Sequence, residues 1–103
     1  MNLSYPTNPK VGEDIRFELI DFDYAITNPI TRVTLEYPTA DGGTDVKTLQ
    51  NIADYGLIGD VLKIWNENSE TKEENFSQSG RYTVTVYADG FKTFSEKIFC
   101  TRS

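Results

Sequence analysis

The side chains best suited to chemistry in this chain are its carboxylates. Asp21 and Asp23 are separated by one residue, so both would face the same side of an extended segment. With Asp54, Asp60 or Asp89 they could supply the hard oxygen ligands that Ca²⁺ prefers. No spacing matches an EF-hand. We therefore expect turn and strand-end carboxylates that face water, and no metal site.

The chain has no histidine, which removes most catalytic arrangements. Ser-His-Asp and Cys-His centres are excluded, and a zinc site lacks its usual ligands. Cys100 is the single cysteine, so no intrachain disulfide can form, and its place near the chain end predicts an edge or tail residue. Tyrosine can ligate haem iron, but the spacing of the six tyrosines singles none out. The sequence therefore predicts a protein that is not an enzyme and holds no cofactor.

Aromatic side chains are the remaining candidates for a functional surface. Tyr24 and Tyr55 fall in segments without clear alternation, and Trp65 falls in phase with Val61 and Lys63, on the outward side of a predicted strand. Large amphipathic aromatic residues are favoured in protein-recognition hot spots. We predict Tyr24, Tyr55 and Trp65 as protein-binding residues, with ordinary core or cross-strand packing as the alternative for each.

Composition places the chain among small globular domains. Its 103 residues carry a net charge of −6, with 38% hydrophobic and 13% aromatic residues. A strongly acidic surface repels nucleic acid, whose binding depends on Lys and Arg. No apolar run approaches the roughly 20 residues that span a bilayer. The composition predicts one domain that neither binds nucleic acid nor inserts into a membrane.

Alternation with a period of two predicts short strands along most of the chain. The segment Asn51–Gly59 is ambiguous and fits either a short helical turn or an irregular strand, and the polar segment Glu67–Glu74 fits a solvated loop or one exposed helical turn. We predict an extended leading segment at residues 1–12 and a single β-sandwich domain at residues 13–100. The expected fold is all-β, an immunoglobulin-like antiparallel β-sandwich of about seven short strands with room for one short helical turn. The predicted strands lie at 13–20, 30–37, 45–49, 60–66 and, as a pair, within 79–99.

The segment Ser79–Phe99 carries the clearest structural pattern. An alternating run follows Gly80, and Tyr82 near its start resembles the tyrosine corner of immunoglobulin-like sandwiches. Asp89-Gly90 is a strong turn signal between two strands, because glycine tolerates a positive φ. We expect Gly80, Tyr82, Asp89 and Gly90 to have structural roles.

The first residues, Met-Asn-Leu-Ser-Tyr-Pro, lack the basic start and apolar core of a signal peptide. Two interpretations are open: a cytosolic protein, or a module of a longer secreted chain whose signal lies elsewhere. The abrupt start and the Cys-Thr-Arg-Ser ending favour the module.

The second half of the chain resembles the haemoglobin-interacting domain of Gram-positive haem-uptake receptors, and the segments 14–19, 23–25 and 30–35 fit the same pattern more loosely. The resemblance covers roughly residues 13–99 and is sharpest in the pattern G-x-Y-T-V-T-V-x-A-x-G-F from Gly80 to Phe91. The Asp41-Gly42-Gly43 turn and the Glu67–Glu74 loop look larger than is usual in the family. The matching residues are Asp60-Val61-Leu62-Lys63-Ile64, Phe76, Ser79-Gly80, Tyr82 to Val86, Ala88-Asp89-Gly90-Phe91 and Phe94.

The resemblance implies a non-catalytic module of a bacterial secreted or wall-attached protein. Such a module would be monomeric within a larger chain and would bind host haemoglobin as a protein. Two other classes of function remain open on the residues alone. One is a structural spacer or adhesive immunoglobulin-like domain, and the other is a carbohydrate-binding module that uses Trp65 and a tyrosine as a stacking platform.

Overall fold

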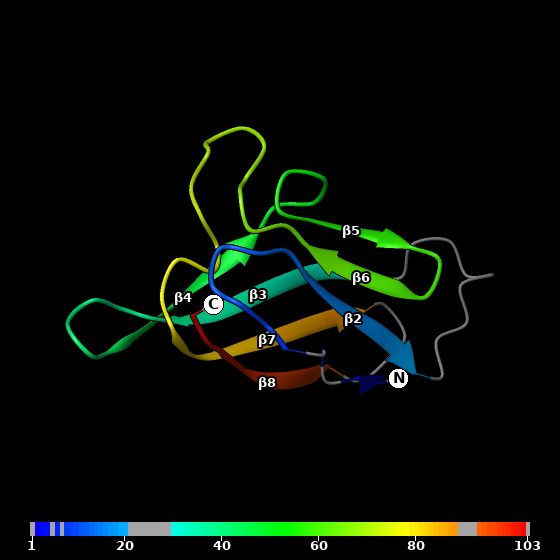
Figure 1. Ribbon diagram of the computed structural model, residues 1–103. Helices are drawn as coiled ribbons and strands as arrows, with labels where there is room; N and C mark the ends of the chain where they lie inside the picture. The colour runs from blue at the N-terminus through cyan, green and yellow to red at the C-terminus, as the bar shows by residue number, and fades with distance from the viewer. Residues whose placement is uncertain (1, 5, 7, 21–29, 89–92, 103) are drawn as a thin grey trace.

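The computed structural model of the chain describes residues 2–4, 6, 8–20, 30–88 and 93–102. These residues form eight strands in two antiparallel sheets, with no helix in the described ranges (Figure 1). The strands are β1 (Asn2–Leu3), β2 (Ile15–Ile20), β3 (Ile30–Pro38), β4 (Thr44–Leu49), β5 (Tyr55–Ile58), β6 (Val61–Ile64), β7 (Gly80–Ala88) and β8 (Phe94–Cys100).

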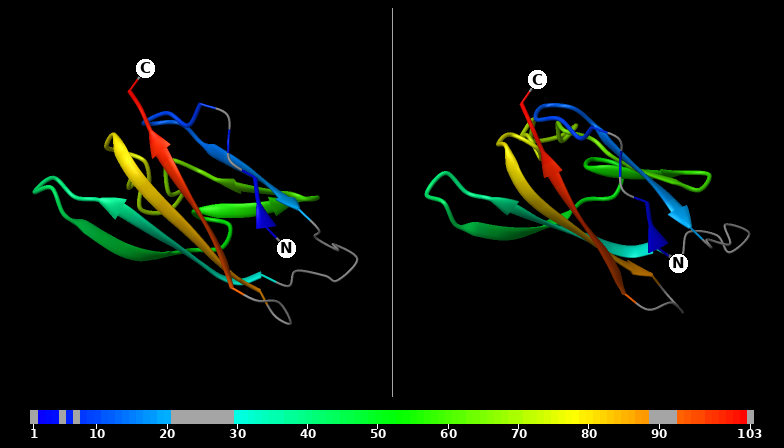
Figure 2. Two further views of the ribbon diagram at one scale, coloured as in Figure 1. Left: turned by 90° about the horizontal axis from the view of Figure 1, so that it is seen from below. Right: turned by 60° about the horizontal axis from the view of Figure 1, so that its bottom comes forward.

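The strand order is that of an immunoglobulin-like sandwich. One sheet has the order β1-β2-β6-β5 and the other β4-β3-β7-β8, which matches the ABED and C′CFG sheets of that fold. The hairpin of β3 and β4 projects beyond the rest of the second sheet (Figure 2). The predicted all-β antiparallel sandwich is confirmed. The strand beyond the predicted seven is β1, a two-residue strand within the leading segment that pairs with the end of β2.

Alternation decides which side chains face the core. Phe17 of β2 lies opposite Leu62 of β6, and Leu35 of β3 lies opposite Val84 of β7. All four have no exposed surface. Since consecutive strand residues point to opposite faces, their neighbours face outward. The apolar faces of the two sheets therefore meet in one core, as the alternating sequence predicts.

Tyr82 ties the start of β7 to the loop before it. Its hydroxyl donates a hydrogen bond to the Gln78 carbonyl oxygen (2.6 Å) and accepts one from the Gln78 amide (3.2 Å). Its ring is buried and packs edge-on against Phe76 with centroids 5.3 Å apart. Gly80 has a φ of 138°, and a Cβ there would come within 3.2 Å of the Pro38 side chain. This is the geometry of a tyrosine corner.

The end of β8 differs from the sequence expectation. Cys100 is not a tail residue: it is the last residue of β8, pairs with Gly80 and is fully buried in the core. Burial raises the pKa of its thiol to about 11. Asp89 and Gly90 lie outside the described residues. The strands that flank them pair antiparallel from Gly80 opposite Cys100 to Val86 opposite Phe94.

The ambiguous segment Asn51–Gly59 forms a turn followed by a strand. Asp54 N donates to the Gln50 carbonyl (2.8 Å) and Ile52 N to the Tyr55 carbonyl (2.8 Å), which closes the turn. β5 then pairs with β6, with Tyr55 opposite Ile64. The strand interpretation is thus correct for residues 55–58, whereas residues 51–54 form a turn.

Candidate functional site

A buried carboxylate organises one end of the sandwich. Asp54 is 5% exposed. One of its oxygens accepts a hydrogen bond from Gln50 N (2.7 Å), and the other accepts from Asn68 Nδ2 (2.9 Å) and Asn75 Nδ2 (3.1 Å). Buried charge is costly unless it is hydrogen-bonded. These three bonds satisfy the carboxylate and join the turn before β5 to the loop between β6 and β7.

The loop 67–74 is folded by its own buried asparagine. Asn68 Oδ1 accepts hydrogen bonds from Glu70 N and Thr71 N, both at 2.8 Å, as in an Asx turn. Ser69 N donates to the Ala53 carbonyl (3.1 Å), so the loop lies against the 51–54 turn. The two segments lie side by side beyond β5 and β6 in Figure 1. The predicted solvated loop is confirmed for its glutamates, which are exposed: Glu67, Glu70, Glu73 and Glu74.

Ile52 is the most exposed large hydrophobic residue of the described chain, at 78%. Its φ is 75°, in the left-handed region that β-branched residues rarely adopt. Such a conformation costs on the order of 1–3 kcal/mol and persists only where neighbouring contacts impose it. Here the contacts are the turn bonds around Asp54. Ile52 was not among the predicted site residues, although an isoleucine next to Asn51 in a turn is itself unusual.

The aromatic residues predicted for protein binding have different environments. Tyr55 is 6% exposed and belongs to the core, so its predicted surface position is wrong. Its place opposite Ile64 in β5 turns the ring inward, and burial raises the pKa of its hydroxyl. Trp65 is partly buried just after β6, with its ring against Gly56. Tyr24 lies outside the described residues.

A small cavity of about 200 Å³ separates β4 from the loop 67–74. Lys47, Asp54 and Glu73 are among the residues that line it. Burial lowers the pKa of the Lys47 ammonium, and the negative charges of Asp54 and Glu73 oppose that effect. Lys47 thus lies on the β4 side of this cavity, and Glu73 lies on the side of the loop.

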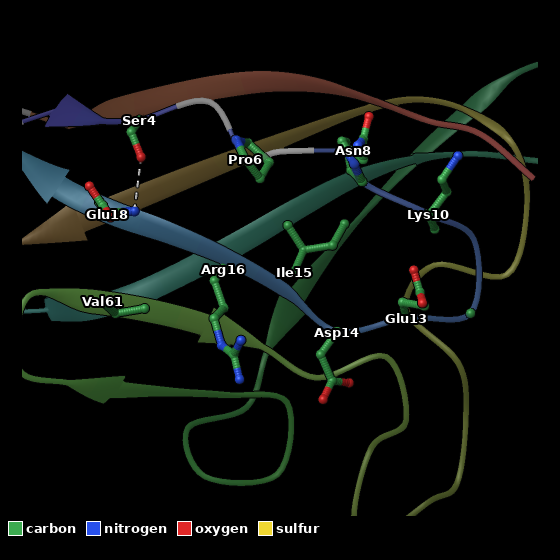
Figure 3. A pocket seen from close by; sticks show the side chains of 12 residues that line it. Ser4, Pro6, Asn8, Lys10, Glu13, Asp14, Ile15, Arg16, Glu18 and Val61 are labelled. Atoms are coloured by element: carbon green, nitrogen blue, oxygen red, sulfur yellow. Dashed lines mark hydrogen bonds between the residues drawn. The ribbon is translucent and has the colours of Figure 1, made fainter. Parts of the chain in front are cut away.

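A larger, open cavity of about 890 Å³ lies between the leading segment and β2 (Figure 3). Its rim mixes basic Lys10 and Arg16 with acidic Glu13, Asp14 and Glu18. The leading segment is held here by a hydrogen bond from Glu18 N to Ser4 Oγ (3.0 Å). The alternating charges favour no one class of ligand, so this cavity is a poor candidate for a specific small-molecule site.

Three of the carboxylates considered for Ca²⁺, Asp21, Asp23 and Asp89, lie outside the described residues. Within the described residues, no group of three or more His, Cys, Asp or Glu could hold a metal ion. No helix there is long and apolar enough to cross a membrane.

Fold and surface together define an immunoglobulin-like β-sandwich whose distinctive features lie in two joined loops. Comparison with protein families then gives a specific assignment. Residues 3–99 match the family described as "Heme-binding protein Shr-like, Hb-interacting domain". The match spans nearly the whole chain, and the protein belongs to this family of haemoglobin-interacting domains. Comparison with curated proteins and with solved structures gave no match.

Proposed function

We propose that this domain docks haemoglobin as a protein and takes no catalytic part in haem chemistry. In this proposal it is a monomeric module of a larger bacterial surface or secreted protein that acquires haem iron. The observation that carries the proposal is the family match over residues 3–99. The proposed location, secreted or attached to the cell wall, is supported by the family to which the domain belongs.

The aromatic chemistry of the chain supports docking of protein rather than ligation of haem. The chain has no histidine to bind haem iron. The four tyrosines that the structure describes are packed or engaged. Tyr55 and Tyr82 are buried, Arg32 lies 4.0 Å from the ring centroid of Tyr87, and the Tyr37 hydroxyl donates to Asp45. A protein surface, rather than the haem iron, is therefore the expected target.

Two alternatives receive less support. A sugar-binding platform would need Trp65 and a tyrosine to present their faces together, but Tyr55 is buried and Trp65 packs on Gly56. A spacer domain with no binding partner does not explain why Ile52 is both exposed and in a strained backbone conformation.

Sedimentation of haemoglobin with the purified domain tests the proposal. Absorbance in the Soret band of haem reports the sedimentation of haemoglobin and not of the domain, because in this proposal the domain carries no haem. Haemoglobin should sediment faster when the domain is added. An unchanged sedimentation boundary with the domain in large excess would contradict the proposal.

A further inference from the structure

We propose that Ile52 and the acidic loop beside it form the surface that contacts haemoglobin, with Ile52 as the apolar anchor. This surface, made of the 51–54 turn and the loop 67–74, is called the Ile52 tip. The inference rests on the proposed function and adds to it the place on the domain where the partner binds.

Ile52 is unfavourable for folding in two independent ways. It is 78% exposed, so it contributes almost nothing to the core. Its φ of 75° suits glycine or asparagine far better than a β-branched residue. A residue that serves folding in neither respect is best explained by what it contacts outside the domain.

The Ile52 tip is also rigidly supported. The buried carboxylate of Asp54 binds Gln50 N on one side of Ile52 and Asn68 and Asn75 on the other. Ile52 N itself donates to the Tyr55 carbonyl (2.8 Å). A side chain on such a fixed turn loses little conformational freedom when a partner covers it, and this favours affinity.

The charge around Ile52 fits a protein partner. The loop that packs on the turn exposes Glu67, Glu70, Glu73 and Glu74, against one lysine, Lys72, which pairs with Glu67 at 3.9 Å. An apolar centre with a polar, solvent-accessible rim is the usual anatomy of a protein-protein contact. The matching surface on haemoglobin would be an apolar pocket bordered by basic side chains.

Other exposed apolar residues carry less weight. Ile58 is 64% exposed but has ordinary strand geometry at the far end of β5. Val46 is 57% exposed on the edge strand β4. Single exposed apolar residues of this kind are common on soluble proteins and need no partner.

Calorimetric titration of haemoglobin into a set of variants tests the proposal. Ile52→Gly should weaken binding at least tenfold and raise the melting temperature, because it removes the apolar contact and relieves the left-handed strain together. Ile52→Leu should keep affinity within about threefold of wild type, since an aliphatic side chain of equal size remains. Ile58→Asp is the matched control and should leave affinity unchanged.

The outcomes separate this inference from the proposed function. If wild-type domain binds haemoglobin and Ile52→Gly binds equally well, the Ile52 tip is not the contact surface. If Ile58→Asp weakens binding as much as Ile52→Gly does, the contact lies on the sheet face and the inference is also overturned. Failure of the wild-type domain to bind at all would reject the proposed function itself, and the inference with it.

Discussion

The indole of Trp65 lies directly over the backbone of Gly56. A Cβ added to Gly56 would stand 2.6 Å from Trp65 Cη2, closer than two non-bonded carbon atoms approach. Glycine is otherwise poor in a strand interior, because it has no side chain to pack. Its presence in β5 is therefore explained by the ring that covers it.

Gly56→Ala should destabilise the domain by about 1–3 kcal/mol, because the new methyl group displaces the indole. Trp65 is the only tryptophan, so a red shift of the emission spectrum would report the displaced ring. The cost should vanish when Gly56→Ala is made in a Trp65→Ala background, where nothing occupies the space. A cost that persists there would show that the glycine is needed for its backbone and not for the ring.

Tyr82→Phe should lower stability by about 1–2 kcal/mol, because the Gln78 amide and carbonyl lose their shared partner. For a domain of this size that corresponds to a fall in melting temperature of roughly 4–16 °C. Haemoglobin affinity should not change, because the hydroxyl points into the corner at the start of β7. An unchanged melting temperature would count against the structural role of the corner.

Asp54→Ala should destabilise the domain by about 2–4 kcal/mol, since it leaves Gln50 N and Asn68 Nδ2 without an acceptor and leaves Asn75 Nδ2 with the Trp65 carbonyl alone. Urea unfolding measures the loss directly. Asp60→Ala is the control, because Asp60 is exposed and should cost well under about 1 kcal/mol. Equal losses for the two variants would mean that the Asp54 network does not stabilise this end of the sandwich.

Stability should fall between about pH 9 and pH 11, in part because of Cys100. Burial raises the pKa of this thiol from 9.0 to about 11. The unfolded state therefore releases its proton first, so the contribution is complete below pH 9 and is lost as the pH rises to the folded value. Two pKa units correspond to roughly 2–3 kcal/mol.

Comparison with Cys100→Ala isolates that contribution. The raised pKa values of Tyr37, Tyr55 and Tyr82 act in the same direction, but those residues are present in both proteins. The variant starts less stable because of the cavity it creates, yet it should lose less stability on titration to pH 11. Parallel pH profiles for the two proteins would rule out a thiol contribution.

Alternation in the sequence predicts the sandwich because consecutive residues of a strand point to opposite faces, a rule that involves only neighbouring residues. The inward sets of β2, β3, β6 and β7 can be read from neighbouring residues. Trp65, just after β6, is partly buried, as are Val61 and Lys63 of the same phase. The tyrosine corner is equally local, since Tyr82 bonds a residue only four positions away. Where a structure depends on such short-range relations, the sequence alone was sufficient.

The candidate site depends on contacts that no local pattern contains. Asp54 is buried because Asn68 and Asn75 reach it from 14 and 21 residues away. Tyr55 turns inward because β5 pairs with β6. The residue at which β5 begins could not be predicted, because the sequence of segment 51–59 has no clear alternation. Cys100 is in the core because β8 continues to the end of the sheet beside Gly80. These three assignments required the tertiary structure.

Calorimetric titration with three ligands tests the central claim most directly: haemoglobin, haem-free globin and free haem. A domain that docks haemoglobin as a protein should bind the first two with comparable affinity and should give no heat with free haem. Binding of free haem with no binding of haem-free globin would contradict the account, because the haem and not the globin surface would then be the ligand.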